Sequence, residues 1–154
     1  SIIDKLNKKG YKVTAKNMIQ HVHDIIGIRI VCSFLSDVYD IVDIIKSSKQ
    51  FKIKEEKDYI KNVKPNGYRS YHLIVEITAP YEDILGNNPG KFFAEIQVRT
   101  IAMDSWASLE HQMKYKHDIK NPELIVKELK RCADELAACD VSMQTIRNLI
   151  NAEN

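Results

Sequence analysis

The sequence predicts an α+β domain in which a mixed β-sheet is flanked by helices and keeps one face open for a ligand. Three observations favour this class. Apolar and polar residues alternate over 71–77 and 92–99, which is the pattern of half-buried strands. Apolar residues recur every three or four positions over 37–49 and 101–116, as they do in amphipathic helices. A third helical pattern starts at Asn121 and continues to the end of the chain.

The size and composition are those of one ordinary globular domain. The chain has 154 residues, of which 44% are apolar and 29% charged. No apolar run approaches the roughly 20 residues that span a bilayer, and no signal peptide is recognisable, so we expect a cytoplasmic protein with no membrane partner. The three cysteines, Cys32, Cys132 and Cys139, form no C-x-x-C pair, which favours reduced thiols over a disulfide or zinc site.

Positive charge is concentrated in one stretch of the chain, although the net charge is only +2. Between Lys46 and His72 there are eight basic residues and three acidic ones. The same stretch holds the turn signal Pro65-Asn66-Gly67. A local excess of five positive charges beside a turn suits a polyanionic ligand. A solvated lysine-rich loop is the alternative, and charge alone does not decide between them.

The first third of the chain predicts a helix, a buried strand and a second helix. Residues 1–23 are helix and connector, broken at Gly10, and we expect that N-terminal residues are missing because the chain begins inside this helix. The β-branched run over 25–34 is typical of a buried strand. Asp37 is expected to cap a helix that continues to about Lys49. Its inward-facing residues are expected to be Val38, Ile41, Val42 and Ile45.

Two alternating strands follow a short strand over 51–55 and an unpatterned segment over 57–69. In the second of them, over 92–99, Ala94, Ile96 and Val98 share one face with Phe92. The other face carries three polar groups, those of Glu95, Gln97 and Arg99. Three polar side chains on one strand face are typical of the floor of a site rather than of a core.

The C-terminal part of the chain predicts two helices, and Asn121-Pro122 supplies the N-cap and first position of the second. Apolar residues then recur at spacings of four and three, which is a heptad seam. These seam residues are Ile125, Leu129, Cys132, Leu136, Cys139, Met143, Ile146 and Ile150. Such a seam packs against another helix, in the same subunit or in a partner, and we expect a homo-oligomer.

Several residues could carry chemistry. Asp24 and Glu95 are hard oxygen ligands at strand positions, and two such carboxylates suit a Mg²⁺ ion that also binds phosphates. Arg29 is costly in an apolar strand unless it meets an anion or a ring; a salt bridge with Asp24 or Glu95 is the alternative. Tyr68 follows the turn and either stacks on a base or closes its loop.

Four blocks stand out: HVHDIIGIRIVCSF at 21–34, KDYIKNVKPNGYRSYHL at 57–73, EIQVRTIAMDSWASLEHQ at 95–112 and YK at 115–116. In order and spacing they resemble the synthetase domain of RelA/SpoT-type alarmone synthetases, in particular the small stand-alone class. The similarity covers nearly the whole chain, and the second and third blocks are the most specific. It implies a nucleotidyltransferase-like fold and transfer of the β,γ-pyrophosphate of ATP to the 3′-hydroxyl of GDP or GTP, with AMP released.

The resemblance also implies a role for each matching residue. Asp24 and Glu95 would hold Mg²⁺, and Glu95 would orient or deprotonate the attacking hydroxyl. Tyr68 would stack on guanine, and Arg29 would pack against adenine. The remaining substrate contacts would come from Lys57, Lys64 and His72 on the acceptor, from Gln97, Arg99 and Asp104 near its pocket, and from Lys5 and Lys8 on ATP.

The resemblance divides the chain into a catalytic part, 1–120, and a helical oligomerisation segment, 121–154. It implies a homotetramer without a hydrolase domain, regulated through an alarmone or RNA. Val63 departs from the family, since many relatives have a second proline there. The upstream part of the ATP-phosphate segment would precede Ser1. An inactive guanine-nucleotide or RNA sensor on the same fold is the alternative, and a structural coiled-coil adaptor would explain the C-terminal helix alone.

Overall fold

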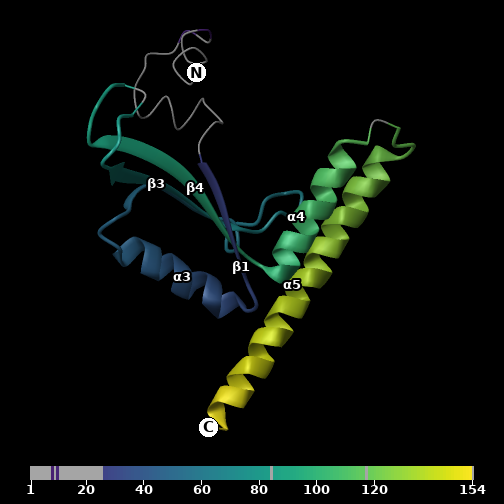
Figure 1. Cartoon of the computed structure of the whole chain (residues 1–154). Helices are drawn as coiled ribbons and strands as arrows, with labels where there is room; N and C mark the ends of the chain where they lie inside the picture. The colour runs from purple at the N-terminus through teal and green to yellow at the C-terminus, as the bar shows by residue number, and fades with distance from the viewer. Residues whose placement is uncertain (1–7, 9, 11–25, 84, 117, 154) are drawn as a thin grey trace.

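The computed structural model describes residues 8, 10, 26–83, 85–116 and 118–153 (Figure 1). Over the last three of these ranges the chain forms four strands and three helices. In chain order they are β1 (Ile26–Cys32), α3 (Leu35–Ser47), β2 (Lys52–Asp58), β3 (Tyr71–Ala79), β4 (Gly90–Thr100), α4 (Ile101–Lys114) and α5 (Pro122–Ala152). No helix in these ranges is long and apolar enough to cross a membrane.

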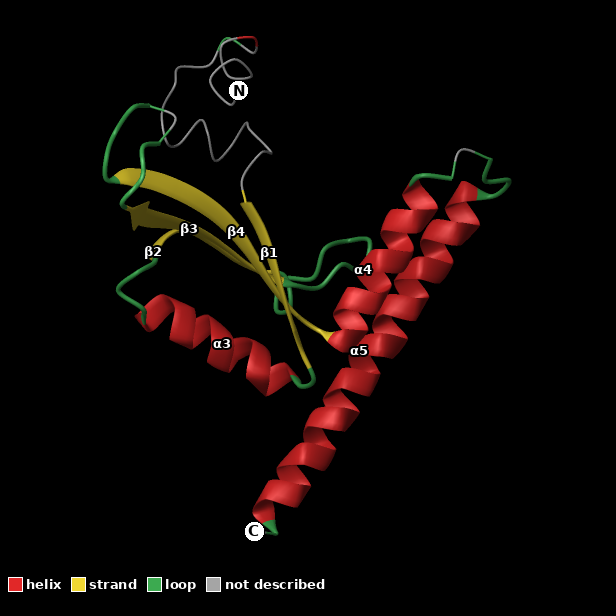
Figure 2. Cartoon of the chain, viewed as in Figure 1, coloured by secondary structure: helices red, strands yellow, loops and turns green. Residues whose placement is uncertain are grey.

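The four strands form one sheet in the order β1-β4-β3-β2 (Figure 2). β1 runs parallel to β4, whereas β4, β3 and β2 pair antiparallel. The predicted mixed sheet flanked by helices is therefore confirmed. The parallel pair is joined through α3, β2 and β3. Segments that are far apart in the sequence, 26–32 and 90–100, therefore lie on neighbouring strands.

Helix α3 covers one face of the sheet, and the core lies between them (Figure 2). Val38, Val42 and Ile45 of α3 are buried, as the helical period predicts. They pack with apolar residues of β3 and β4 that lie on one side of the alternation. Each such buried side chain contributes on the order of 1.5–3 kcal/mol. The sheet residues of this core are Cys32, Tyr71, Leu73, Val75, Ala94, Ile96 and Val98.

The α4–α5 hairpin stands beside the sheet (Figure 1), and Thr100 connects it to β4. Thr100 is the last residue of β4 and the N-cap of α4; its Oγ1 accepts a hydrogen bond from the Met103 amide at 3.2 Å. The same hydroxyl donates to Asp140 Oδ2 on α5 at 2.6 Å. On the next turns of α4, Trp106 Nε1 donates to the Leu129 carbonyl at 2.7 Å. These bonds fix α5 against the start of α4.

Several predicted details of the first half are wrong. β1 is an edge strand of the described sheet rather than a buried strand, and Ile26, Ile28 and Val31 are exposed. An apolar run does not reveal where in a sheet its strand lies. Asp37 does not cap α3: it lies in the first turn, Phe34 is the N-cap residue, and Asp37 pairs with Arg147. The strand predicted over 51–55 extends to Asp58, so Lys57 belongs to β2.

The heptad seam is covered along half of α5. Ile125, Leu129, Cys132 and Leu136 are half-buried beside α4, whereas Cys139, Met143, Ile146 and Ile150 are exposed. Over its second half, α5 meets the rest of the chain through polar groups instead. Gln144 Oε1 accepts from the Ser36 amide at 2.9 Å, and Arg147 lies 2.5 Å from Asp37. Within the described part of the chain, therefore, only the first half of the seam is covered, by α4.

Candidate active site

The sheet face opposite α3 carries a row of polar side chains that crosses all four described strands. Arg29 on β1 is in register with Gln97 on β4, Gln97 with His72 on β3, and His72 with Lys57 on β2. Residues directly opposite on neighbouring strands point to the same face. Four of the predicted site residues, from sequence positions 29 to 97, thus lie side by side.

Glu95 lies on the same face of β4, one pleat away from this row. Its Oε1 is 3.2 Å from His72 Nδ1 and accepts a hydrogen bond from Gln97 Nε2 at 3.3 Å. The hydrogen bond from His72, aided by that from Gln97, lowers the pKa of Glu95 to about 2 although partial burial opposes the shift. Glu95 is therefore ionised throughout the neutral range, and its side chain is still 38% exposed.

Arg99 organises the other end of this face. Its side chain is only 7% exposed, and its guanidinium donates to Tyr68 Oη at 2.6 Å and to Gln97 Oε1 at 2.7 Å. Its Nε donates to Ser70 Oγ at 3.2 Å, and Nη1 lies 3.2 Å from Asp104 on α4. A guanidinium with this many donors engaged holds its partners in fixed directions.

Tyr68 connects Arg99 to His72 and, through it, to Glu95. Its hydroxyl accepts from Arg99 and lies 2.8 Å from His72 Nε2. If His72 Nδ1 carries the proton that faces Glu95, Nε2 is free to accept from Tyr68, so every bond from Arg99 to Glu95 has a consistent direction. Arg99, Tyr68, His72 and Glu95 form this chain of hydrogen bonds, which we call the acceptor network.

The ring of Tyr68 is held by a loop, residues 64–69, that we call the Tyr68 loop. The Tyr68 amide donates to Asn66 Oδ1 at 3.0 Å, and the Gly67 amide donates to the Lys64 carbonyl at 2.9 Å. Lys64 Nζ lies 5.0 Å from the centre of the Tyr68 ring and 4.5 Å from that of Tyr59. A cation over an aromatic face is attracted to it. The ring is half-buried in this arrangement.

An open cavity of about 470 Å³ lies between this polar face and α4. Its size is within the range of small-molecule sites. The lining residues are Arg29, Tyr68, Gln97, Arg99, Ala107, Ser108, Glu110, His111 and Gln112. The four polar residues of α4 in this set were not among the predicted site residues. Asp104, Ser108 and His111 recur at spacings of four and three, so the helical period could have found that face.

Arg29 has a partner that the sequence did not indicate. Its side chain is 56% exposed, and its guanidinium lies 3.4 Å from Asp104, which thereby bridges Arg29 and Arg99. The prediction of a buried arginine in an apolar strand is wrong, because β1 is at the edge of the described sheet and this face borders the cavity.

The remaining predicted residues are not all brought together. Lys57, the β2 member of the polar row, has its Nζ 2.6 Å from Glu55, and Lys8 is an exposed residue. Asp24 and Lys5 lie outside the described residues. Among the described residues, no group of three His, Cys, Asp or Glu side chains could hold a metal ion. Glu95 has the chemistry of a Mg²⁺ ligand, an ionised and accessible carboxylate, but it is a single ligand there.

The arrangement of sheet and helices is that of the small alarmone synthetases. The crystal structure of small alarmone synthetase 2 from Bacillus subtilis matches with a TM-score of 0.75 and 44% identity, over 96% of this chain and 74% of that one. The structure of small alarmone synthetase 1 from the same organism, bound to its product pppGpp, matches with a TM-score of 0.76 and 33% identity, over 97% and 74%.

The sequence comparisons lead to the same group. GTP pyrophosphokinase YwaC of Bacillus subtilis is 45% identical over 151 residues, which are 98% of this chain and 70% of the relative. GTP pyrophosphokinase YjbM of the same organism is 34% identical, and this chain spans 66% of its length. A family model described as the region found in RelA / SpoT proteins matches residues 1–120. The chain belongs to the RelA/SpoT family, and the predicted family and fold are confirmed.

Proposed function

We propose that this chain is the synthetase of a (p)ppGpp-forming enzyme: it transfers the β,γ-pyrophosphate of ATP to the 3′-hydroxyl of GDP or GTP and releases AMP. The GTP pyrophosphokinase class is supported by the relatives of that name, among them YwaC at 45% identity over almost the whole chain. The acceptor network is the observation that assigns this activity to particular residues. It connects the ionised carboxylate of Glu95, through His72, to the ring of Tyr68, which lines a cavity large enough for a nucleotide.

In the proposed reaction the 3′-oxygen of the acceptor bonds to the β-phosphorus of ATP as the bond from that phosphorus to the oxygen of the α-phosphate breaks. AMP leaves with that oxygen, and the hydroxyl proton passes to solvent or to a carboxylate. Such transfers depend on positioning and charge stabilisation rather than on a covalent intermediate. The residues of the polar face would therefore act by holding the two nucleotides in line.

Glu95 would hold Mg²⁺ together with Asp24 and orient the 3′-hydroxyl. Bound Mg²⁺ would supply positive charge to the phosphates. A carboxylate with a pKa of about 2 is a weak base at neutral pH, so orientation by a hydrogen bond is a better role for Glu95 than proton removal. His72 would keep Glu95 in place through Nδ1 while the acceptor ribose and phosphates approach the same strand.

Tyr68 would stack on the guanine, and Arg29, at the β1 end of the polar row, would stack on the adenine. Stacking on Tyr68 requires one ring face to be free, and Lys64 lies over the ring at 5.0 Å. The acceptor phosphates would attract that ammonium away from the ring. Lys57 would add charge for the acceptor phosphates, and Lys5 and Lys8 for those of ATP.

Gln97, Arg99 and Asp104 would act mainly by supporting the residues that meet the substrates. Arg99 is buried and engaged with Tyr68, Gln97, Ser70 and Asp104, so its guanidinium holds Tyr68 rather than reaching far into the cavity. Asp104 holds Arg29 through Oδ1, the same oxygen that lies beside Arg99. A change at any of these three residues would displace an aromatic ring or an arginine from its substrate.

We also propose that residues 1–120 form the catalytic part and that 121–154 supply an oligomer contact, as in a homotetramer. Several apolar residues along α5 are exposed, among them Val141, Met143 and Ile146. Isolated exposed apolar residues are ordinary, but a series of them on one helix is typical of a contact surface, which supports this division. Size measurement in solution tests it: a strict monomer would contradict the oligomer.

The reaction is tested with labelled ATP, Mg²⁺ and either GDP or GTP, with products separated by thin-layer chromatography. AMP together with labelled (p)ppGpp is expected. Release of pyrophosphate with a nucleotidyl group on the acceptor would assign a different transferase class. Salt-sensitive RNA binding without any turnover would favour the inactive sensor instead. The Glu95→Gln variant, measured in the same assay, is the control for a contaminating activity.

A further inference from the structure

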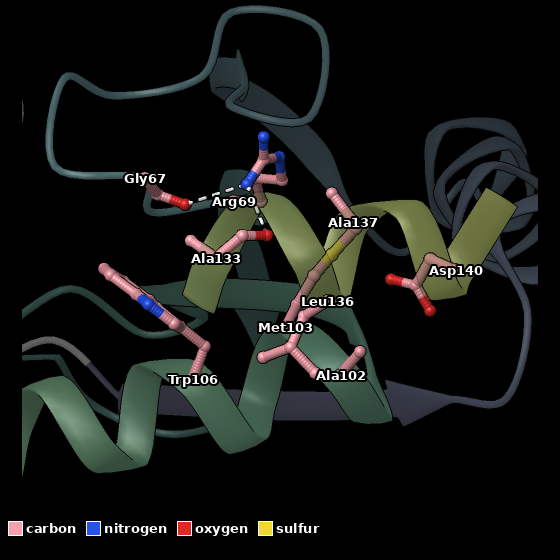
Figure 3. A pocket seen from close by; sticks show the side chains of 9 residues that line it. All are labelled: Gly67, Arg69, Ala102, Met103, Trp106, Ala133, Leu136, Ala137 and Asp140. Carbon is pink, nitrogen blue, oxygen red and sulfur yellow. Dashed lines mark hydrogen bonds between the residues drawn. The ribbon is translucent and has the colours of Figure 1, made fainter. Parts of the chain in front are cut away.

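Helix α5 lies beyond the residues matched by the family model, yet it contacts the Tyr68 loop (Figure 3). Arg69, the residue after Tyr68, extends toward α5 and donates through Nη1 to the carbonyl of Ala133 at 3.0 Å and to that of Gly67 at 3.3 Å. Its Nη2 lies 3.2 Å from Asp134 Oδ1. The side chain is only 16% exposed, so this arginine, which the charge count assigned to a polyanionic ligand, is engaged by α5 instead.

The residue before Tyr68 also meets α5. Gly67 has a φ of +96°, a conformation that side chains other than glycine rarely adopt. A Cβ placed on Gly67 would lie 2.6 Å from the Cβ of Ala133, which is far closer than two carbon atoms can approach. The backbone of the loop therefore rests directly on Ala133, which is itself buried.

α5 is in turn fixed to the body of the enzyme on both sides of this contact. Leu129, one turn before Ala133, accepts from Trp106 on α4, and Asp140, two turns after it, accepts from Thr100. Figure 3 shows the small cavity behind the contact, into which residues of the loop, α4 and α5 project. Its lining is Gly67, Arg69, Ala102, Met103, Trp106, Ala133, Leu136, Ala137 and Asp140.

We propose that α5 is a positioning element of the acceptor site, with Arg69 and Ala133 as the residues that hold the Tyr68 loop. This inference rests on the proposed function, since it concerns how Tyr68 meets the guanine base. Neither residue is among those proposed to contact a substrate. They fix the backbone on both sides of Tyr68, so that the ring and its hydroxyl stand where Arg99 and His72 bind them before the acceptor arrives.

The expected signature is a selective loss of acceptor affinity. A loop that populates its binding-competent form only a tenth of the time weakens the apparent affinity for its ligand tenfold. ATP is proposed to meet Arg29 on β1, whose guanidinium is held by Asp104 of α4 and not by Arg69 or Ala133, so the KM for ATP should change little. A role of α5 in folding alone would instead lower the melting temperature without separating the two substrates.

Arg69→Met tests the loop side, because methionine keeps a long side chain and removes all three polar contacts. The KM for GDP or GTP is expected to rise about tenfold, with the KM for ATP within about twofold of wild type. Arg69→Lys should recover part of the affinity through the contact with Asp134. Arg131→Met is the matched control, because Arg131 is an exposed arginine of α5 that pairs with Glu128 and Glu135 of the same helix.

Ala133→Leu tests the helix side against Ala138→Leu, the same substitution at an exposed position of α5. The first should raise the acceptor KM by about tenfold or more and the second should not change it. Calorimetric titration with GDP in the absence of ATP gives the same comparison independently of turnover, and therefore separates this inference from the proposed reaction. If Ala133→Leu does not fold, the folded Arg69 variants decide.

The inference is overturned if the folded Arg69→Met variant binds GDP as wild type does, or if KM for ATP rises as much as KM for the acceptor. It is equally overturned if the folded Ala133→Leu and Ala138→Leu variants are indistinguishable in GDP affinity. A wild type that binds GDP and loses that affinity in Arg69→Met, but shows no pyrophosphate transfer, would uphold the role of α5 and refute the proposed reaction.

Discussion

The two faces of strand β4 differ in what they do, although neighbouring residues on it are separated by one peptide unit. Ala94, Ile96 and Val98 are buried against the α3 side and belong to the core. Glu95 and Gln97, which alternate with them, belong to the polar face that borders the cavity. Because the two functions alternate along one strand, stability and catalysis should respond separately to changes at adjacent positions.

The largest expected effect is that of Glu95→Gln on catalysis. Glutamine keeps the shape and removes the negative charge, so several kcal/mol of transition-state stabilisation should be lost and kcat should fall about 10³-fold or more. GTP binding should remain largely intact. Steady-state kinetics and equilibrium binding on the same preparation check both statements, and an active variant would remove the proposed role of Glu95.

The neighbouring substitution Ile96→Ala should do the reverse. Ile96 is buried in the core, and such truncations cost about 2–5 kcal/mol. For a domain of this size the melting temperature should fall by about 4–20 °C. Activity per folded molecule, measured well below that temperature, should stay within about threefold of wild type. A large drop in kcat without loss of stability would show that the two faces are not independent.

Within the polar face, two substitutions of Tyr68 separate the role of its ring from that of its hydroxyl, because the ring and the hydroxyl have different partners. Tyr68→Ala removes the proposed stacking, worth about 1–3 kcal/mol, and should raise the acceptor KM about 5–150-fold. Tyr68→Phe keeps the ring and loses the bonds to Arg99 and His72, so a rise of less than about tenfold is expected. Equal effects of the two variants would argue against stacking.

The smallest expected effects are on the pH dependence of stability, and they have opposite signs in two regions. The pKa of Glu95 is lowered to about 2, so its stabilising contribution is complete above pH 4.5 and is lost as pH falls through 2. Burial raises the pKa of Asp140 above 3.8, although the hydrogen bond from Thr100 opposes the shift. The stability of wild type relative to Asp140→Asn should therefore fall as pH rises from about 4 through that raised pKa.

Urea unfolding of wild type, Glu95→Gln and Asp140→Asn between pH 2 and 8 measures both effects. Because Glu95 stays ionised above pH 3, it should also produce no inflection in the activity profile between pH 5 and 9. Difference curves of the same sign for the two variants would contradict the assignment of these two carboxyl groups.

The sequence predicts the alternating strands well, because in β3 and β4 one face meets the core and the other does not. Leu73, Val75, Ala94, Ile96 and Val98 are all buried as the alternation indicates. The same reasoning fails for β1, where every apolar residue looks like a core residue, although Ile26, Ile28 and Val31 are exposed. Hydrophobicity reports that a strand forms and not its position in the sheet.

The candidate site is predictable as a set of residues but not as a network. The two-residue period of a strand is enough to place Glu95, Gln97 and Arg99 on one face, so they are predicted without reference to any related protein. The pairing of Arg29 with Asp104, and the contact of Arg69 with Ala133, join segments from different parts of the chain. Such contacts depend on how α4 and α5 pack, which no local pattern encodes.

The close approach of Gly67 and Ala133 limits how this enzyme can vary. A side chain at position 67 is opposed twice, by a φ of +96° and by the methyl group of Ala133 only 2.6 Å from where its Cβ would lie. Replacing Ala133 by glycine would relieve the second obstacle and leave the first. Position 67 should therefore tolerate almost no replacement, whereas position 133 should accept only residues as small as alanine unless the loop shifts with it. In a library of random variants, glycine at position 67 and a small residue at position 133 should therefore either both be kept or both be replaced.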